Sequence, residues 1–233
     1  MRWILNNLPY IGDRLLDHLA LAVPAIILSF LISIPLGWLA NRFRPARGAV
    51  LSLVGLFYAI PSLPLFLALP AIIGTGLRDP INVTIGLTLY GLALMIRSTA
   101  DALQSVDADI TQSATAMGFS TFGRFWKVDL PLAGPVLLAG IRVVAVSTIS
   151  LTTVGAVLGI SSLGSLFTDG FARDIQAEVY TGIVLTIAMA LLFDFIIVLI
   201  GRMLMPWTKS TSRSSVRGLR ARRARVERAA ATV

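Results

Sequence analysis

The 233-residue sequence contains no cysteine and a single histidine, His18. The absence of cysteine excludes disulfides, thiolate metal sites and cysteine nucleophiles. One histidine leaves little material for a metal site or a histidine-based catalytic triad, and we interpret His18 as an interfacial polar residue at the start of a membrane span. A nucleotide-binding P-loop is also absent, because neither of the two lysines, Lys127 and Lys209, follows a glycine-rich turn.

Charged residues are scarce as well. They make up 14% of the chain, whereas 56% of the residues are hydrophobic and the mean hydropathy is +0.82. A soluble domain of this length needs a far more charged surface. The composition therefore predicts an all-α integral membrane protein with one compact membrane domain.

Five apolar segments come close to the length of about 20 helical residues that a bilayer requires. The sequence before the first of them contains Asp13, Arg14 and Asp17, and we expect residues 1–18 to form a short helix at the interface. The membrane domain then covers residues 1–207. The predicted spans are residues 19–40, about 50–73, 81–96, 131–155 and 179–201.

The basic residues predict the orientation of the chain. With five spans and a C-terminus inside the cell, the inner segments hold fifteen Lys and Arg residues and the outer segments hold four. The positive-inside rule then places the N-terminus outside, the C-terminus in the cytoplasm, and residues 98–131 in a cytoplasmic loop. Residues 202–233 carry nine of the basic residues against a single acid, Glu227. We therefore predict that residues 208–233 form a disordered cytoplasmic tail that is attracted to anionic lipid and binds no nucleic acid.

Two opposite charges lie deep inside predicted spans. Arg142 follows the inner end of its span by about ten residues, or roughly 15 Å of helix, and Asp194 lies at a similar depth on an antiparallel span. Because charges inside a bilayer are costly and usually paired, we predict an Arg142–Asp194 ion pair. A proton-relay role for Asp194 is the alternative. Arg97 and Asp101, spaced i, i+4, are expected to form a local pair on one helix.

Two prolines, Pro61 and Pro64, interrupt the second predicted span, because each lacks a backbone N–H. A break inside a bilayer is tolerated where the freed carbonyls face protein or water. The segment at Pro61–Ser62 is therefore predicted either to line a translocation path or to be a kinked packing helix, and the sequence favours neither. Hydroxyl residues on the fourth span either line the same path or bond to backbone carbonyls. The candidate path residues are Pro61, Ser62, Ser147 and Thr148.

Between the third and fourth predicted spans lies the polar stretch QSATAMGFSTFGRFWKVDLP. The residues before its first glycine predict a helix that begins with Ser105 or Asp107 as its cap. Gly118 is typical of a left-handed turn that ends such a helix. Ser120 then caps a second short helix, which we expect to stop before Pro131.

An aromatic stripe runs along this second helix beside Arg124 and Lys127. By physical chemistry alone, the pattern equally fits an amphipathic helix that lies on the inner leaflet. The aromatic residues are Phe119, Phe122, Phe125 and Trp126.

The spacing of the stretch resembles the cytoplasmic signature of bacterial ABC importer permeases: Glu-Ala-Ala, three residues, Gly, nine residues, Ile-x-Leu-Pro. Here Gln112-Ser113-Ala114 precedes Gly118 at that spacing, and Val128-Asp129-Leu130-Pro131 completes it. The signature's Glu and first Ala are replaced by Gln112 and Ser113, which removes a charge. The resemblance implies that the loop 105–131 docks in a groove of an ATPase subunit and transmits its closure to the spans. The residues that it implicates are Gln112, Ser113, Ala114, Gly118, Phe119, Phe122, Phe125, Leu130 and Pro131.

The segments AIPSLPLF, LTLYGLALMIRSTADALQSVDADI and LPLAGPVLLAGIRVVAV resemble the osmoprotectant branch of these permeases, which moves glycine betaine, carnitine or choline. The resemblance implies a non-catalytic subunit with a type I importer fold in the bacterial inner membrane. It also implies three partners: a separate ATPase that binds ATP and Mg²⁺, a second permease subunit, which is a copy or a paralogue, and an extracytoplasmic substrate-binding protein. The alternatives are a methionine or other amino-acid importer, a stand-alone secondary transporter and a structural or assembly protein.

Overall fold

A computed structural model describes residues 2–209 of the chain, and within that range every regular element is helical. Most of the predicted tail, residues 208–233, lies outside the described residues. The helices are α1 (Arg2–Asn6), α2 (Leu8–Arg42), α3 (Arg44–Ala59), α4 (Ser62–Ile73), α5 (Pro80–Gln104), α6 (Ala108–Ala116), α7 (Thr121–Arg124), α8 (Leu130–Thr152), α9 (Ser165–Ala172) and α10 (Gln176–Leu204). Shorter helical turns are a π-helical turn at Phe125–Asp129 and 3₁₀ turns at Thr153–Leu158 and Pro206–Lys209.

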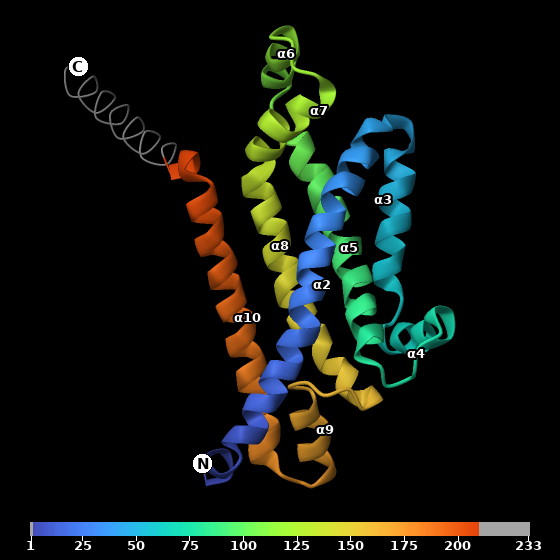
Figure 1. The fold of residues 1–233 in the computed structure, drawn as a ribbon, viewed down its shortest axis with the longest axis vertical. Helices are drawn as coiled ribbons and strands as arrows, with labels where there is room; N and C mark the ends of the chain where they lie inside the picture. The colour runs from blue at the N-terminus through green and yellow to red at the C-terminus, as the bar shows by residue number, and fades with distance from the viewer. Residues whose placement is uncertain (1, 210–233) are drawn as a thin grey trace, which may run out of the picture.

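The long helices stand side by side as an elongated bundle, with α5 between α2, α3 and α8 (Figure 1). Helices α6 and α7 project beyond the bundle at one end, which we call the loop end. Helix α9 and the N-terminus lie at the opposite end, the α9 end, whereas α10 finishes at the loop end. The two ends of the described chain therefore lie on opposite sides of the bundle.

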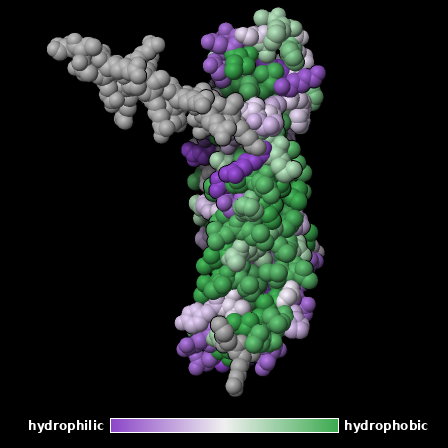
Figure 2. Space-filling view, turned by 90° about the vertical axis from the view of Figure 1, so that its left-hand side faces the viewer, coloured by the Kyte–Doolittle hydropathy of each residue, from purple (hydrophilic) through white to green (hydrophobic). Residues whose placement is uncertain are grey.

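On the face in Figure 2 an apolar surface covers the middle of the bundle, and hydrophilic residues gather at both ends. Helix α2, helix α5, the continuous helical segment 121–158 and helix α10 are each long and apolar enough to cross a membrane. Helices α3 and α4 pass the same test only as a bent pair, which gives up to five spans. This arrangement confirms the predicted all-α, polytopic fold.

The first span differs from the prediction, because α2 is unbroken from Leu8 to Arg42 and only Arg2–Asn6 form a separate short helix. The charges expected to keep this region at the interface are accommodated within α2. The guanidinium of Arg14 lies 3.3 Å from the carboxylate of Asp17 and 5.0 Å from the ring centre of Tyr10. Local partners of this kind let the helix continue past its charged residues.

The interpretation of His18 as an interfacial residue is also wrong, because its side chain is completely buried. Its Nδ1 accepts a hydrogen bond of 3.4 Å from the backbone N–H of Leu163, in the segment that connects α8 to α9. A buried backbone N–H outside a helix needs an acceptor. His18 therefore fixes this connection against α2.

The second span is not a single helix over residues 50–73. Helices α3 and α4 meet at an angle of 100°. Pro61 disfavours helical backbone at the residue before it, and Ile60 is accordingly extended, with ψ at 127°. Pro64 lies in the first turn of α4, where proline is tolerated. The break therefore comes from Pro61, and α4 turns away from the direction of α3 and lies beside the start of α5 (Figure 1).

Close helix contacts hold the bundle together, and Gly37 shows how close they are. A Cβ atom added at Gly37 of α2 would lie 2.6 Å from Cγ2 and 2.7 Å from Cβ of Thr99 on α5. Gly12, on the same helix, has no heavy atom within 4 Å of such a Cβ. Small residues at helix crossings are what bring membrane helices into van der Waals contact.

We predict that Gly37→Ala destabilises the protein by about 1–3 kcal/mol, the usual cost of overpacking. Gly12→Ala is the matched control and should be neutral or slightly stabilising, because alanine favours helix. The measurement is the thermal unfolding midpoint of the detergent-solubilised protein. Equal midpoints for the two variants would contradict the tight α2–α5 contact.

Candidate coupling loop and membrane path

The loop that connects α5 to α8 folds as the sequence predicts at its turn. Asp107 caps α6 by accepting a 2.8 Å hydrogen bond from the N–H of Asp109. Gly118 has φ at +85°, the left-handed region that favours glycine, and ends the helix. The Oγ of Ser120 then accepts a 3.1 Å hydrogen bond from the N–H of Gly123 and caps α7. Local capping chemistry thus fixes the helix–Gly–helix geometry.

The residues that the signature implicates differ in burial: four are exposed, two are buried, and Phe119, Leu130 and Pro131 are half-buried. Gln112, Ser113 and Gly118 are exposed, and Phe122 is 68% exposed. Ala114 and Phe125 are buried. The ring of Phe125 lies 5.6 Å from that of Trp38, which anchors the loop to α2. Part of the signature therefore builds the loop, and the other part faces outward.

Exposed apolar side chains surround the turn. They form a surface that we call the loop patch, and monomeric soluble surfaces rarely present such a group without a partner. Arg124 supports the patch from within, because it donates to Thr115 of α6 at 3.0 Å and to Asp129 at 3.3 Å. The loop patch consists of Ile110, Met117, Phe122 and Trp126.

The second short helix does not stop before Pro131, contrary to the prediction. Helix α7 passes through the π-helical turn Phe125–Asp129 directly into α8. The N–H of Leu130 bonds to the carbonyl of Phe125, five residues earlier. A proline within a helix clashes with the carbonyl four residues before it, and the wider π turn accommodates Pro131 at the start of α8. The loop and the span are therefore one continuous helical segment.

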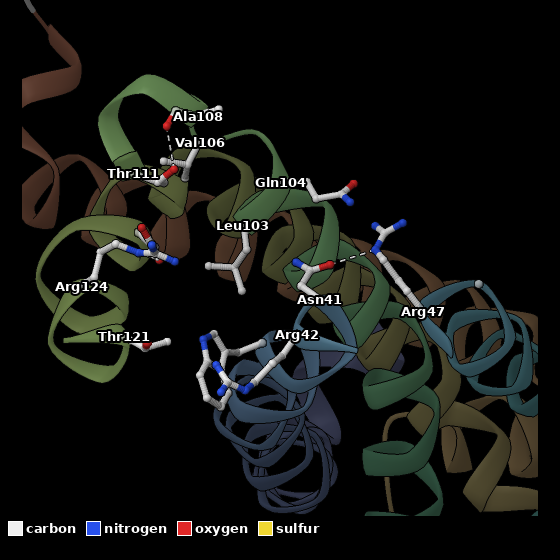
Figure 3. Close-up of a pocket in the computed structure, with 13 residues that line it drawn as sticks. Asn41, Arg42, Arg47, Leu103, Gln104, Val106, Ala108, Thr111, Thr121 and Arg124 are labelled. Carbon is white, nitrogen blue, oxygen red and sulfur yellow. Dashed lines mark hydrogen bonds and ion pairs between the residues drawn. The ribbon is translucent and has the colours of Figure 1, made fainter. Parts of the chain in front are cut away.

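A cavity of about 700 Å³ lies at the base of the loop, between α2, α5, α6 and α7 (Figure 3). Arg47 closes one side, donating to Oδ1 of Asn41 and to Oδ1 of Asp101, each at 2.8 Å. Asn41 in turn donates to the carbonyl of Ala100 at 2.7 Å. Asp101 is thus paired with Arg47 from α3, and not with Arg97 of its own helix as expected. These bonds fix the α2–α3 turn to the end of α5.

Arg142 of α8 and Asp194 of α10 lie together, as their depth in the sequence predicts. The guanidinium donates from Nε at 2.6 Å and from Nη2 at 2.9 Å to the two carboxylate oxygens. This two-point geometry is the strongest that an arginine and a carboxylate can form. The pair joins α10, which is otherwise largely exposed, to α8.

Of the predicted path residues, Ser147 and Thr148 line a cavity of about 460 Å³ between α3, α5 and α8. Pro61 and Ser62 form the bend beside it. The hydroxyl of Tyr90, which lines the cavity, donates to the carbonyl of Ile60 immediately before Pro61. The structure therefore places two of the four candidates in the cavity wall and the other two at the break that Tyr90 supports.

Sequence reasoning missed the two tyrosines of this cavity, Tyr58 and Tyr90. Their rings stand edge to face, with centres 5.8 Å apart. Each is a polar aromatic residue within an apolar helix, and that was the available signal. A buried tyrosine hydroxyl usually needs a hydrogen-bond partner. The partner of Tyr90 is the carbonyl of Ile60, which lies at the break between α3 and α4.

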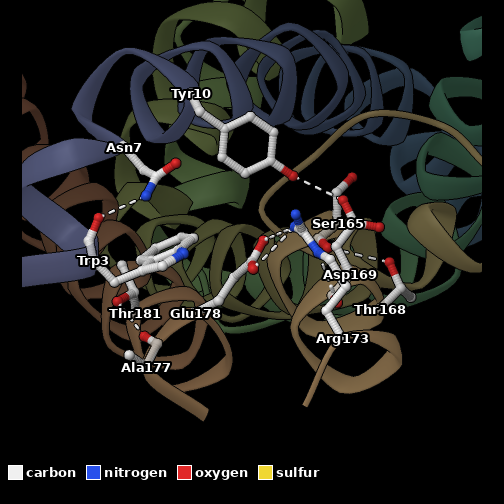
Figure 4. Close-up of polar contacts among 10 residues, drawn as sticks. All are labelled: Trp3, Asn7, Tyr10, Ser165, Thr168, Asp169, Arg173, Ala177, Glu178 and Thr181. Carbon is white, nitrogen blue, oxygen red and sulfur yellow. Dashed lines mark hydrogen bonds and ion pairs between the residues drawn. The ribbon is translucent and has the colours of Figure 1, made fainter. Parts of the chain in front are cut away.

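A polar cluster fixes the α9 end of the bundle (Figure 4). The hydroxyl of Tyr10 on α2 donates to Asp169 of α9 at 2.8 Å. Nη2 of Arg173, just after α9, lies 2.9 and 3.0 Å from the two carboxylate oxygens of Glu178 on α10, whose side chain is fully buried. These contacts connect α2, α9 and α10, and we call α9 with its flanking residues the α9 platform. Phe171, which is 86% exposed, projects from it.

A membrane bundle with a projecting helix–Gly–helix loop is the arrangement that the resemblance to importer permeases implies. Residues 30–210 match the family described as binding-protein-dependent transport system inner membrane component. The chain belongs to this family, and it is therefore a permease component of an inner-membrane transport system.

Named relatives and a solved structure agree with this assignment. The chain is 30% identical to the glycine betaine/carnitine/choline transport system permease protein OpuCD of Bacillus subtilis, over 88% of each chain. It is also 30% identical to the osmoprotectant import permease protein OsmW of Salmonella typhimurium, over 84% of this chain and 93% of OsmW. A chain of the MetNI methionine ABC transporter in an inward-facing conformation superposes with a TM-score of 0.76 at 23% identity, covering 84% and 96% of the two chains, which shows a shared fold.

We predict that single changes of the intramembrane pair, Arg142→Asp or Asp194→Arg, lower the amount of folded protein in the membrane, because each leaves like charges facing one another. The exchanged double variant restores an ion pair between the same helices and should recover most of the loss. Folded protein is measured by fluorescence size-exclusion chromatography of membrane extracts. A double variant no better than the worse single variant would show that the two residues act independently.

Proposed function

We propose that this chain is the membrane-spanning permease subunit of an ATP-driven importer for osmoprotectants of the quaternary-amine class, such as glycine betaine, carnitine or choline. The observation that carries the proposal is the loop: a capped helix–Gly–helix unit that continues without a break into the helix lining the cavity. The names of OpuCD and OsmW support the substrate class. The likeness to a methionine transporter concerns the fold alone, so it does not favour the amino-acid alternative.

The loop 105–131 is the proposed docking site for the ATPase. Its exposed loop patch supplies apolar side chains for a groove in that partner, and exposed Gln112 and Ser113 lie on the same projection. Movement of the loop reaches the membrane through the π-helical turn, because a helix transmits displacement along its axis. Ser147 and Thr148 lie on the helix that would move.

The proposal assigns the chemistry of ATP hydrolysis to the partner chain, which binds ATP and Mg²⁺, and no catalysis to this subunit. A second permease subunit, either a copy or a paralogue, completes the path. The family description also supports a soluble binding protein that delivers the substrate. The α9 platform with exposed Phe171 is the surface that we assign to this delivery.

Transport is tested by reconstituting the permease with its ATPase in proteoliposomes and adding the binding protein. We expect ATP-dependent uptake of labelled glycine betaine or choline. Uptake that proceeds without ATP or the ATPase would indicate a secondary transporter and contradict the proposal. Uptake of methionine in place of the quaternary amines would reassign the substrate.

The role of the loop is tested by Gly118→Val in the same assay. A β-branched residue disfavours the left-handed backbone at φ +85° by roughly 1–2 kcal/mol, and an added Cβ meets no atom within 4 Å. The variant should therefore lose co-purification of the ATPase and uptake while keeping the folded bundle. Gly118→Asn is the matched control, since asparagine tolerates this backbone conformation, and full activity of Gly118→Val would exclude a docking role for the turn.

The orientation is tested with single cysteines, which are unique labels because the natural chain has none. The positive-inside rule places the loop end in the cytoplasm and the α9 end outside. Phe171→Cys should react with a membrane-impermeant maleimide in intact spheroplasts, whereas Ser113→Cys should react only after the membrane is opened. The reverse pattern would invert the proposed topology.

A further inference from the structure

Two adjoining cavities run along α5 between α3 and α8, and they share Tyr58 and Leu94 in their walls. The first, of about 460 Å³, contains Tyr90 and the hydroxyl residues of α8. The second, of about 450 Å³, extends toward the loop end and contains Arg97, Ser98 and Asp101. We call the two together the α5 groove. Each has a volume typical of a small-molecule site.

Tyr58 occupies the junction of the α5 groove. Its side chain is 48% exposed, and its ring lies edge to face against Tyr90. The hydrogen bond from Tyr90 to the carbonyl of Ile60 fixes its ring. The two tyrosine rings therefore form a preorganised aromatic surface. Aromatic faces attract quaternary ammonium groups by cation–π interaction, and an ammonium without N–H groups needs no hydrogen-bond acceptor.

The rest of the first cavity suits a cation of this type. Its wall contains the hydroxyl residues Ser147, Thr148, Ser150 and Thr153 and otherwise apolar or aromatic side chains. None of its lining residues carries a charge, so nothing there repels a cation or binds it as a tight ion pair. Such a wall holds a trimethylammonium group weakly, which allows it to be released.

A positive charge lies at the other side of Tyr58. Arg97 is exposed, and it follows Leu94 by three residues, so both lie on one face of α5. Asp101, the acid in the same cavity, is already paired with Arg47 at 2.8 Å. Among the described residues Arg97 itself has no ion-pair partner. Its guanidinium is therefore available to a carboxylate.

We propose that the α5 groove is a substrate site within the membrane. Tyr58 contacts the quaternary ammonium group of the substrate, and Arg97 binds the carboxylate of those substrates that have one. This inference rests on the proposed transport of quaternary amines and adds residues that determine specificity inside the permease. It predicts a difference between glycine betaine, which has both groups, and choline, which has the ammonium group but no carboxylate.

The test measures direct binding of labelled glycine betaine and choline to the permease–ATPase complex in lipid nanodiscs, with the binding protein left out. The wild-type complex should bind both ligands saturably. Tyr58→Leu should raise the Kd for both about three- to thirtyfold, the range that loss of one cation–π contact gives. Tyr58→Phe keeps the aromatic face and should stay within about twofold of the wild type.

Phe57→Leu is the matched control, because Phe57 is the neighbouring residue on α3, is equally exposed at 48%, and lines neither cavity. It should leave both Kd values unchanged. An increase in Kd for Phe57→Leu equal to that for Tyr58→Leu, or no increase for either, would overturn the site. The thermal midpoints of all variants show whether they are folded.

The carboxylate half of the site is tested with Arg97→Gln. This change should weaken glycine betaine binding and leave choline binding unchanged, and equal effects on the two ligands would remove Arg97 from the site.

Uptake by the complete transporter is measured in parallel. If the wild-type transporter takes up substrate normally and Tyr58→Leu binds it as tightly as the wild type, the α5 groove is not the substrate site, whereas the proposed transport function remains supported. Absence of uptake contradicts both.

Discussion

The continuous helical segment from α7 through the π-helical turn into α8 is the constraint on which the arrangement depends. An ordinary α-helix would bring the ring of Pro131 against the carbonyl of Lys127. The five-residue bond from Leu130 to Phe125 avoids this clash and keeps the helix continuous. Because of this continuity, a loop that projects from the bundle and a cavity inside it belong to one mechanical element.

The polar groups inside the bundle follow a common rule, since a bilayer offers no water to satisfy them. Arg142 bonds to Asp194, His18 accepts from Leu163, and Tyr90 donates to the carbonyl of Ile60. Each of these pairs joins two segments that are distant in sequence. Polar residues are therefore the specific connections of the bundle, whereas apolar contacts and close-packed glycines supply its general cohesion.

The features predicted correctly from the sequence are those that local chemistry or simple counting determines. The cap at Ser120 and the left-handed turn at Gly118 need only neighbouring residues. The Arg142–Asp194 contact follows from helical rise and topology. The break at Pro61 was predicted, although its angle of 100° was not. The start of α2 was missed because local partners accommodate Arg14 within the helix. The pairing of Asp101 with Arg47 was missed because it depends on a partner from another part of the chain. The cavity was recognised only in part: the hydroxyl residues of α8 are evident in the sequence, but the contact between Tyr58 and Tyr90 exists only after α3 and α5 pack.

In the proposed docking of the loop, the position of the signature's glutamate is occupied by Gln112. Gln112 is exposed and carries no charge, so an ion pair at this position is not available to hold the partner. The loop patch remains, with Met117 and Phe122 each more than two-thirds exposed. Exposed ion pairs contribute little free energy compared with burial of large apolar side chains. In the proposed function, the capped turn and the loop patch therefore determine docking, and residue 112 contributes no charge to it.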